Sequence, residues 1–287
     1  MNVIKRLLQK YVYQDWNIAI AEMNDDFSLS NIKWMKHSYK DRWFADPFII
    51  ADTEDSYTIL VEEYLHSTRR GRLARLTVSK TDCTLLSNET MLDLPTHLSF
   101  PNPITVDGEM YIYPENGAAG ITKYYTYGKY FDEAGELSAL PLADATIVKI
   151  TDTYYLLATL GKECNGNTLR VYKSVSPLGG FRECQQIQFP DNSARRAGNV
   201  FAWNGQLISP AQVCNNDYGE GVSLQLLEEK NGHITLKEIK RMMPPTKNYS
   251  EGFHTYNVYS ENVVVIDGYR YGSKFFHKLY FNIRNKK

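Results

Sequence analysis

Arg42-Trp43-Phe44-Ala45-Asp46-Pro47-Phe48-Ile49-Ile50, followed by Tyr57-Thr58-Ile59-Leu60-Val61-Glu62-Glu63, is the stretch that decides the fold. Both runs are apolar and as short as typical strands, and a polar segment separates them. Asp46 heads the first run, and Pro47 predicts an extended backbone for it, because the proline ring disfavours the helical region for the preceding residue. The pattern indicates a β-hairpin that carries carboxylates at one end.

The same hairpin layout recurs four more times along the chain. Asp107-Gly108 and Asn204-Gly205 mark two of the turns, and these dipeptides are strong short-range hairpin signals. The units are about 40 to 57 residues apart, which leaves room for four strands in each. The predicted heads of the first strands are Asp46, Asn102, Asp144, Gly198 and His254, and the tails of the second strands are Glu62 or Glu63, Glu115, Thr159, Gln212 and Asp267.

Five such units predict an all-β, five-bladed β-propeller. Further strands are expected at residues 16–21, 71–78, 122–127, 169–173 and 222–227. A β-sandwich also accommodates many hairpins, but it gives no reason for the repeat. Apolar residues at helical spacing predict a short amphipathic helix over residues 1–14, and residues 15–287 form the single propeller domain. The helix is expected to pack on the propeller; the alternative is peripheral contact with an anionic membrane.

Composition and charge exclude several classes of function. Of the 287 residues, 43% are hydrophobic and 23% charged, which is ordinary for a soluble globular protein. The 32 basic and 33 acidic residues give a formal net charge of -1, and no basic run indicates a nucleic-acid partner. The 21 tyrosines, 12 phenylalanines and 4 tryptophans favour strands and also suit stacking on sugar rings.

Targeting signals are not evident in the sequence. Cys83, Cys164, Cys184 and Cys214 lack metal-ligand spacing, so free thiols in a reducing compartment are expected. The first twelve residues do not form a signal peptide, and no apolar run approaches the roughly 20 residues that a spanning helix needs. The sequence therefore predicts a cytoplasmic protein.

The chemistry is expected where the heads and tails of the inner strands meet, at one mouth of the propeller channel. Two carboxylates that flank a glycosidic bond are the usual machinery of glycoside cleavage. Asp46 is the predicted base and Glu115 the predicted acid, with Asp144 as a tuning or sugar-binding carboxylate. No metal and no cofactor are expected, and a central ion or water in the channel is left open.

Other polar and aromatic residues near the strand ends are expected to contact the ligand. One arginine of the Arg195-Arg196 pair is expected to bind a pocket carboxylate, or a phosphate or acidic sugar. Phe44 and Phe100 are candidate rim residues. The predicted substrate-binding set is Trp43, Glu62, Glu63, His97, Asn102, Arg195, Arg196, Gln212, Tyr218, His254 and Asp267.

At these residues the chain resembles the five-bladed propellers of arabinanases, β-xylosidases, levansucrases and invertases. It is more similar to the propeller domain at the N-terminus of glucosamine inositolphosphorylceramide transferase, which also accompanies some sugar formyltransferase-like proteins. The resemblance covers about residues 42–268. It is carried by residues 43–48, 62–64, 97–101, 114–115, 144–146, 196–198, 210–212 and 254–257.

This resemblance implies a role in surface-polysaccharide biosynthesis. In the glycosidases a first-blade Asp is the base, a second Asp tunes the acid and a Glu is the acid. Asp46 matches the base, whereas Glu115 and Asp144 come in the opposite blade order. The expected function is cleavage or transfer of a glycosyl unit in capsule, lipopolysaccharide or exopolysaccharide assembly. The alternative is a non-catalytic module that binds a glycan or nucleotide sugar and partners a glycosyltransferase of polysaccharide biosynthesis.

Overall fold

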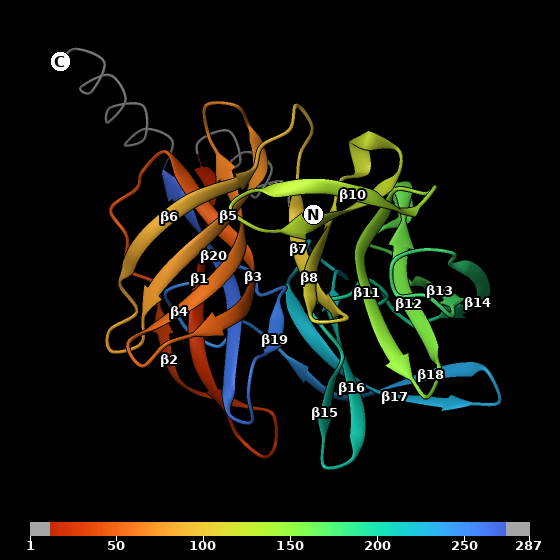
Figure 1. Cartoon of the computed structure of the whole chain (residues 1–287). Coiled ribbons are helices and arrows are strands. Elements are labelled where there is room, and N and C mark those ends of the chain that lie inside the picture. The colour runs from red at the N-terminus through yellow and green to blue at the C-terminus, as the bar shows by residue number, and fades with distance from the viewer. Residues whose placement is uncertain (1–11, 274–287) are drawn as a thin grey trace.

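The computed structural model describes residues 12–273, which form five antiparallel sheets of four strands each. Each sheet is one blade of a β-propeller, and the predicted five-bladed, all-β fold is confirmed (Figure 1). Helical structure within residues 12–273 is limited to two 3₁₀ turns, η1 (Gly117–Ala119) and η2 (Gly161–Glu163). Neither these turns nor any other described segment is a helix of the length and apolarity needed to cross a bilayer.

The strands follow the predicted hairpins in chain order, and the first strand of each hairpin is at one edge of its sheet. Blade one contains β3 (Arg42–Asp52), β4 (Ser56–Leu65), β5 (Arg70–Ser79) and β6 (Leu85–Leu92). Blade two contains β7 (Ser99–Val106), β8 (Glu109–Glu115), β9 (Thr122–Tyr127) and β10 (Phe131–Ser138). Blade three contains β11 (Leu142–Ile150), β12 (Thr153–Leu160), β13 (Thr168–Ser174) and β14 (Arg182–Gln188). Blade four contains β15 (Phe201–Trp203), β16 (Gln206–Val213), β17 (Gly221–Lys230) and β18 (His233–Met242).

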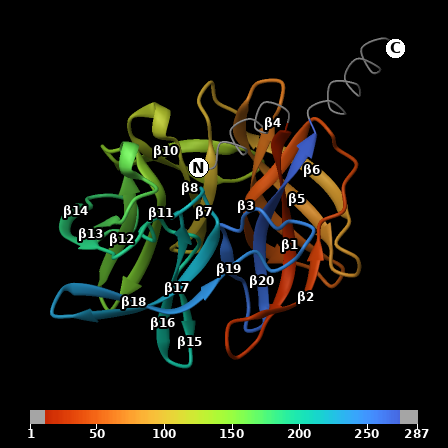
Figure 2. The same ribbon diagram turned by 180° about the vertical axis from the view of Figure 1, so that it is seen from behind.

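Blade five joins the two ends of the chain. Its order is β19 (Tyr256–Val258), β20 (Val263–Ser273), β1 (Val12–Met23) and β2 (Leu29–Trp34). Figure 2 shows β20 beside β1, and the two strands pair without a break from Val12 opposite Ser273 to Glu22 opposite Val263. This pairing closes the ring of blades and makes β1 the third strand of blade five, next to β20.

The predicted N-terminal helix lies largely outside the described residues. Residues 12–14, its last three, instead begin β1 and pair with residues 271–273 of β20. The pairing with β20 overrides the local helical spacing over these three residues. The register of this pairing cannot be predicted from the N-terminal sequence alone.

The second strand of blade one shows how neighbouring blades cover a sheet on both faces. Residues 59–63 of β4 are all buried, as expected for a strand without a solvent face. Ile59 and Val61 pack with Ile18 and Val265 of blade five. Leu60 packs instead with the cluster that contains Ile112 of blade two. Successive side chains of β4 therefore point to opposite neighbours, which decides where Glu62 and Glu63 lie.

Three inner strands begin with the same irregularity. The strand register shifts between Ala45 and Phe48, between residues 99 and 102 and between residues 143 and 146. Asp46, Phe100 and Asp144 occupy these shifts with φ angles of 50°, 47° and 42°. The predicted extended backbone at Asp46 is therefore wrong. Its left-handed conformation, which Asp tolerates better than most residues, turns its N–H toward Asp267.

The same irregularity corrects the alignment of blade two. Phe100, not Asn102, occupies the position equivalent to Asp46 and Asp144. Asn102 lies two residues further along and donates its side-chain amide to the carbonyl of Ala145 in blade three. Thr146 and Asn257 make the same kind of contact to the next blade. Asn102 thus joins blades and is not among the described residues that line the central pocket.

Candidate functional site

A pocket of about 260 Å³ opens where the strand ends of blades one, two and five converge. It combines carboxyl, imidazole, guanidinium and aromatic side chains. Its lining residues are Gln14, Trp16, Trp43, Ala45, Glu62, Tyr64, His97, Ser99, Glu115, Arg195, Tyr218 and His254. Seven of them belong to the set predicted from the sequence: Trp43, Glu62, His97, Glu115, Arg195, Tyr218 and His254. The fold therefore brings these seven residues, which come from distant segments of the chain, to one pocket.

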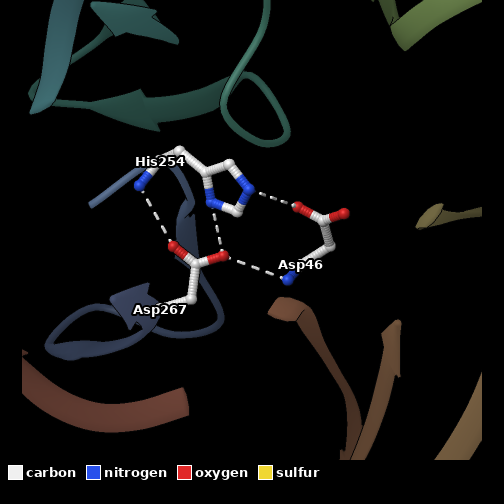
Figure 3. Close-up of side chains that lie close together, drawn as sticks. All are labelled: Asp46, His254 and Asp267. Atoms are coloured by element: carbon white, nitrogen blue, oxygen red, sulfur yellow. Dashed lines mark hydrogen bonds and ion pairs between the residues drawn. The ribbon is translucent and has the colours of Figure 1, made fainter. Parts of the chain in front are cut away.

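Asp46, His254 and Asp267 form a buried chain of interactions against this pocket (Figure 3). Asp267 Oδ2 lies 2.7 Å from His254 Nδ1, and His254 Nε2 lies 3.6 Å from Asp46 Oδ1. The backbone N–H groups of His254 and Asp46 donate to the same Asp267 carboxylate. Thr255 Oγ1 lies 3.1 Å from Asp46 Oδ1 and 2.8 Å from Asp267 Oδ2. Asp267 therefore fixes the imidazole that faces the pocket.

The same three residues offer ligand atoms within 4.8 Å of one another, the spacing of a candidate metal group. The oxygens of Asp267, however, already accept hydrogen bonds from three backbone N–H groups, from the Thr255 hydroxyl and from the His254 ring. An ion would have to replace several of these bonds. The donor set therefore fits a hydrogen-bonded relay better than a metal centre.

Arg195 links two carboxylates that come from different blades. Its Nη2 lies 2.8 Å from Glu115 Oε2 at the end of β8, and its Nε lies 2.6 Å from Asp144 Oδ2 on β11. Gln212 Nε2 also donates to Asp144 Oδ2, at 2.6 Å. Glu115 in turn accepts the backbone N–H of Asp144. Asp144 and Gln212 are fully buried behind the pocket, so they position Arg195 and Glu115 rather than line the cavity.

Glu62 and Glu63 lie on opposite faces of β4. Glu62 lines the pocket beside His97, whose Nε2 lies 3.4 Å from its Oε1. Glu63 faces the other way and accepts hydrogen bonds from Arg42, Arg72 and Asn88. The prediction that both residues bind substrate is therefore corrected for Glu63, because strand alternation directs only one of two successive side chains into the pocket.

Arg196 also lies away from the pocket. Its guanidinium is fully buried in blade four and donates to the carbonyls of Ser193 and Ala194 and to the side chains of Ser209 and Gln225. It ties together backbone segments and meets no carboxylate within the described residues. Of the two neighbouring arginines, only Arg195 reaches the site.

Burial and mutual repulsion shift three carboxyl groups of the site, those of Asp46, Glu62 and Glu115, toward their protonated forms. Burial raises the pKa of Asp46 to about 6, although the charge of His254 opposes the shift. Burial raises the pKa of Glu115 to about 8 against the charge of Arg195. Burial and the charges of Asp46 and Glu115 hold the pKa of Glu62 well above its usual range. Acids that are protonated near neutral pH can donate a proton or a hydrogen bond to a ligand.

Aromatic rings form much of the pocket wall. Trp43 and Tyr64 stack in parallel, with centroids 4.5 Å apart and planes 2° apart. Trp16 stacks on His254 at 4.2 Å, and Tyr218 meets the same imidazole edge-on at 5.3 Å. Such rings offer apolar faces to sugar rings and polar edges to hydroxyl groups. Phe44 and Phe100, also considered as rim residues, are fully buried in the core.

The sequence interpretation missed Trp16 and Tyr64 as pocket residues. Tyr64 is two residues after Glu62, so strand alternation already indicates that both point to the same side. Trp16 had no comparable signal, because β1 reaches the pocket only through its pairing with β20. Within β1, Gln14 and Trp16 line the pocket.

Solved structures of carbohydrate-active enzymes share this fold. An arabinofuranosidase from Podospora anserina in complex with cellotriose gives a TM-score of 0.57 at 8% identity, over 88% of this chain and 97% of that one. An exo-β-1,3-galactanase from Phanerochaete chrysosporium with galactose gives 0.54 at 13% identity, over 76% and 57%. A β-1,3-galactosidase of glycoside hydrolase family 43 gives 0.55 at 14%, over 82% and 59%. At these identities the likeness establishes the propeller fold.

Sequence comparison identifies the family. Curated relatives named glucosamine inositolphosphorylceramide transferase 1 are 29% identical over 215 residues in Oryza sativa subsp. japonica and 27% identical over 198 residues in Arabidopsis thaliana. The matches cover 71% and 65% of this chain but only 28% and 26% of the relatives. Residues 19–257 match the family model "Glucosamine inositolphosphorylceramide transferase 1, N-terminal". The chain therefore belongs to the family of this N-terminal domain, and it folds as a five-bladed propeller.

Proposed function

We propose that the central pocket binds a single glycosyl unit and that the protein cleaves or transfers it during surface-polysaccharide biosynthesis. The observation that carries this proposal is that Glu62 and Glu115, two acids with raised pKa values, line one cavity together with stacked aromatic rings. A carboxyl group that stays protonated near neutral pH is what proton donation to a leaving oxygen requires.

Charge favours a glycan over a nucleotide sugar as the ligand. Arg195 is the cation of the pocket wall, and two carboxylates already occupy its guanidinium. A diphosphate would meet several acids and find no uncommitted arginine among the described lining residues. A sugar, in contrast, can donate its hydroxyl hydrogens to carboxylate oxygens and stack its ring on Trp43 or Tyr64.

In the proposed chemistry, Glu115 is the acid that Arg195 and the Asp144 N–H hold in place. Asp46 lies against His254 rather than on the pocket wall. To act as a base, it would therefore accept a proton from the ligand through the imidazole of His254. Asp267 orients that imidazole through Nδ1. The residues of this chain thus offer a proton donor on one side of the pocket and an oriented imidazole on another.

The second candidate is a non-catalytic glycan-binding module that serves a glycosyltransferase partner. It is favoured by the contacts that hold Asp46 within the fold: the Phe100 N–H donates to its Oδ2, and Thr255 Oγ1 lies 3.1 Å from its Oδ1. The relatives named as transferases extend well beyond the matched region, since it makes up 28% and 26% of their length. A propeller that presents the glycan to a separate catalytic unit accounts for both observations.

The test compares wild type with Asp46→Asn and Glu115→Gln on activated aryl glycosides and nucleotide sugars, scoring turnover and binding separately. Turnover of an aryl glycoside that Glu115→Gln lowers by about 100-fold or more supports the catalytic proposal, because general acid catalysis contributes about 10² to 10⁴. Binding without turnover in all three proteins supports the module. Neither binding nor turnover of any carbohydrate contradicts both.

A further inference from the structure

The segments that flank the propeller, residues 1–11 and 274–287, carry a charge opposite to that of the propeller itself. These 25 residues hold eight basic residues and no acidic one, whereas residues 12–273 hold the other 24 basic and all 33 acidic residues. The formal net charge is therefore +8 for the two flanking segments and -9 for the propeller. Such a separation of charge favours an anionic partner for the basic segments.

Both flanking segments are also rich in apolar side chains. Basic residues alternate with them, and lipid headgroups attract cations while the layer beneath accepts apolar side chains. A nucleic acid offers the charge without an apolar layer, so the composition favours the surface of an anionic bilayer. The apolar residues are Val3, Ile4, Leu7, Leu8 and Tyr11 in the first segment and Phe275, Phe276, Leu279, Tyr280, Phe281 and Ile283 in the second.

The fold brings the starting points of the two segments together. Val12 is opposite Ser273 in the antiparallel pairing of β1 with β20. Paired strands lie about 5 Å apart, so the two segments begin side by side at one corner of blade five. Their combined charge is therefore attached to a single place on the propeller.

A pocket of about 620 Å³ lies at this end of β1 and β20, and its wall is basic. Carboxylates within the fold hold its two arginines, whereas Lys36 and Lys40 are exposed and can reach a partner outside the pocket. The cationic side chains of the wall are Lys36, Lys40, Arg42 and Arg270, against the single carboxylate of Asp15. This excess of cations, on a propeller that is acidic as a whole, adds to the charge of the flanking segments.

Successive residues of β1 alternate between the basic pocket and the central pocket. Tyr13 and Asp15 line the basic pocket, whereas Gln14 and Trp16 line the central one. Both pockets therefore open near the start of β1, beside the two flanking segments.

We propose that the start of β1, the end of β20 and the basic pocket form a docking surface for an anionic lipid bilayer, together with residues 1–11 and 274–287. Docking in this way holds the central pocket close to the bilayer. The inference goes beyond the proposed function and does not depend on it. The contrasting possibility is that the basic segments bind the acidic propeller of the same chain, which leaves no affinity for lipid.

Binding of the whole chain to lipid vesicles tests the inference. Vesicles of phosphatidylcholine are compared with vesicles that also hold about 30% phosphatidylglycerol, at about 0.1 M and about 0.5 M NaCl, and sedimentation measures the bound fraction. The expected partition coefficient is about tenfold or more higher on the anionic vesicles, because each basic residue near such a surface contributes about fivefold. High salt should abolish this preference.

Two groups of substitutions separate the flanking segments from the basic pocket. Lys10→Gln, Lys274→Gln and Lys278→Gln in combination should lower partitioning onto anionic vesicles by about tenfold or more. Lys36→Gln combined with Lys40→Gln should lower it by about fivefold or more, since both side chains are exposed beside the flanking segments.

The matched control removes two exposed charges from other blades. Lys149→Gln combined with Lys237→Gln changes side chains of β11 and β18, in blades three and four, and should leave partitioning within about twofold of wild type. Circular dichroism spectra and melting temperatures equal to those of wild type show that each variant is folded.

Three outcomes overturn the inference. Absence of binding to anionic vesicles shows that the basic segments have another partner, as in the contrasting possibility. Equal binding to both kinds of vesicle, or binding that high salt leaves unchanged, shows that anionic lipid is not recognised. A loss of binding in the control as large as in the other two variants shows that net charge alone is responsible and that this surface is not the docking site.

Discussion

The guanidinium of Arg195 lies 2.8 Å from the carboxylate of Glu115, and this ion pair joins blade four to blade two beside the pocket. The same guanidinium lies 2.6 Å from Asp144 of blade three. The Arg195 and Asp144 side chains are less than one-tenth exposed, and that of Glu115 is 18% exposed. One arginine therefore holds three blades together at the point where ligand is expected to bind.

Removing this arginine should strongly destabilise the protein. Arg195→Met leaves Glu115 and Asp144 without their shared cation, and breaking a buried ion pair typically costs about 3 to 5 kcal/mol. The control is Arg170→Met, which breaks the pair of Arg170 with Glu183, where both side chains are 32% exposed and about 1 kcal/mol or less is expected. Urea unfolding at pH 7 measures both free energies. Equal losses in the two variants would show that the Arg195 cluster carries no special stability.

Glu62 and Glu63 should respond to the same substitution in opposite ways. Glu63→Gln weakens the contacts with Arg42 and Arg72 and should cost about 2 to 3 kcal/mol, as for buried hydrogen bonds between charged groups. Glu62→Gln removes a buried carboxyl with an unpartnered oxygen and should leave the free energy of unfolding unchanged or raise it. Urea midpoints of the two variants and of wild type decide this. A larger loss for Glu62→Gln than for Glu63→Gln would mean that Glu62 has a structural partner.

The contrast between Glu62 and Glu63 also shows how much of the site can be predicted from the sequence. Hairpin turns and the repeat predict five blades, and the strand expected at residues 122–127 coincides with β9. Strand alternation indicates that Glu62 and Glu63 face opposite sides, but it does not tell which side is the pocket. That choice depends on packing, since Val61 contacts blade five and Leu60 contacts the cluster of blade two.

Two other features depend on tertiary context in the same way. Local sterics before Pro47 indicate an extended backbone at Asp46. Its N–H, however, donates a hydrogen bond to Asp267, which is more than two hundred residues distant in the chain. Trp16 reaches the pocket because β20 pairs with β1. Both depend on the closure of the ring by the two ends of the chain, and no local pattern encodes that register.

Stability should fall as the pH rises from about 5 to 8. The folded protein keeps protons on Asp46, with a pKa of about 6, and on Glu115, with a pKa of about 8, whereas the unfolded chain releases them near pH 4. In this window the folded state binds more protons than the unfolded state, so the free energy of unfolding decreases with pH. The raised pKa of His254 acts in the same direction, because its contribution is present below its unfolded pKa and is lost as the pH rises through the folded one.

Asp267 contributes with the opposite sign but outside this window. Its pKa is lowered chiefly by the charge and hydrogen bond of His254, against burial, so its contribution is present above about pH 4 and is lost on acidification. Melting temperatures at constant ionic strength between pH 5 and 8 measure the trend. Glu115→Gln should flatten the slope between pH 6 and 8. Burial lowers the pKa of His37 and of His97, which opposes the trend within the window, so the slope of Glu115→Gln relative to wild type is the decisive comparison. Equal slopes in the two proteins would show that Glu115 is ionised in the folded state.

Gly71 should be essential both for packing and for the position of Glu62. A Cβ at this residue would lie 2.4 Å from Glu62 Oε1 and 2.4 Å from the backbone oxygen of Leu98. The backbone oxygen cannot move aside easily, so Gly71→Ala should cost about 1 to 3 kcal/mol, as overpacking does, and should weaken ligand binding by displacing the carboxyl. Gly117→Ala is the matched control, because nothing lies within 4 Å of a Cβ there. Urea unfolding and sugar titration of both variants check the two effects. Gly71→Ala with wild-type stability and binding would contradict the close packing of Glu62 against β5.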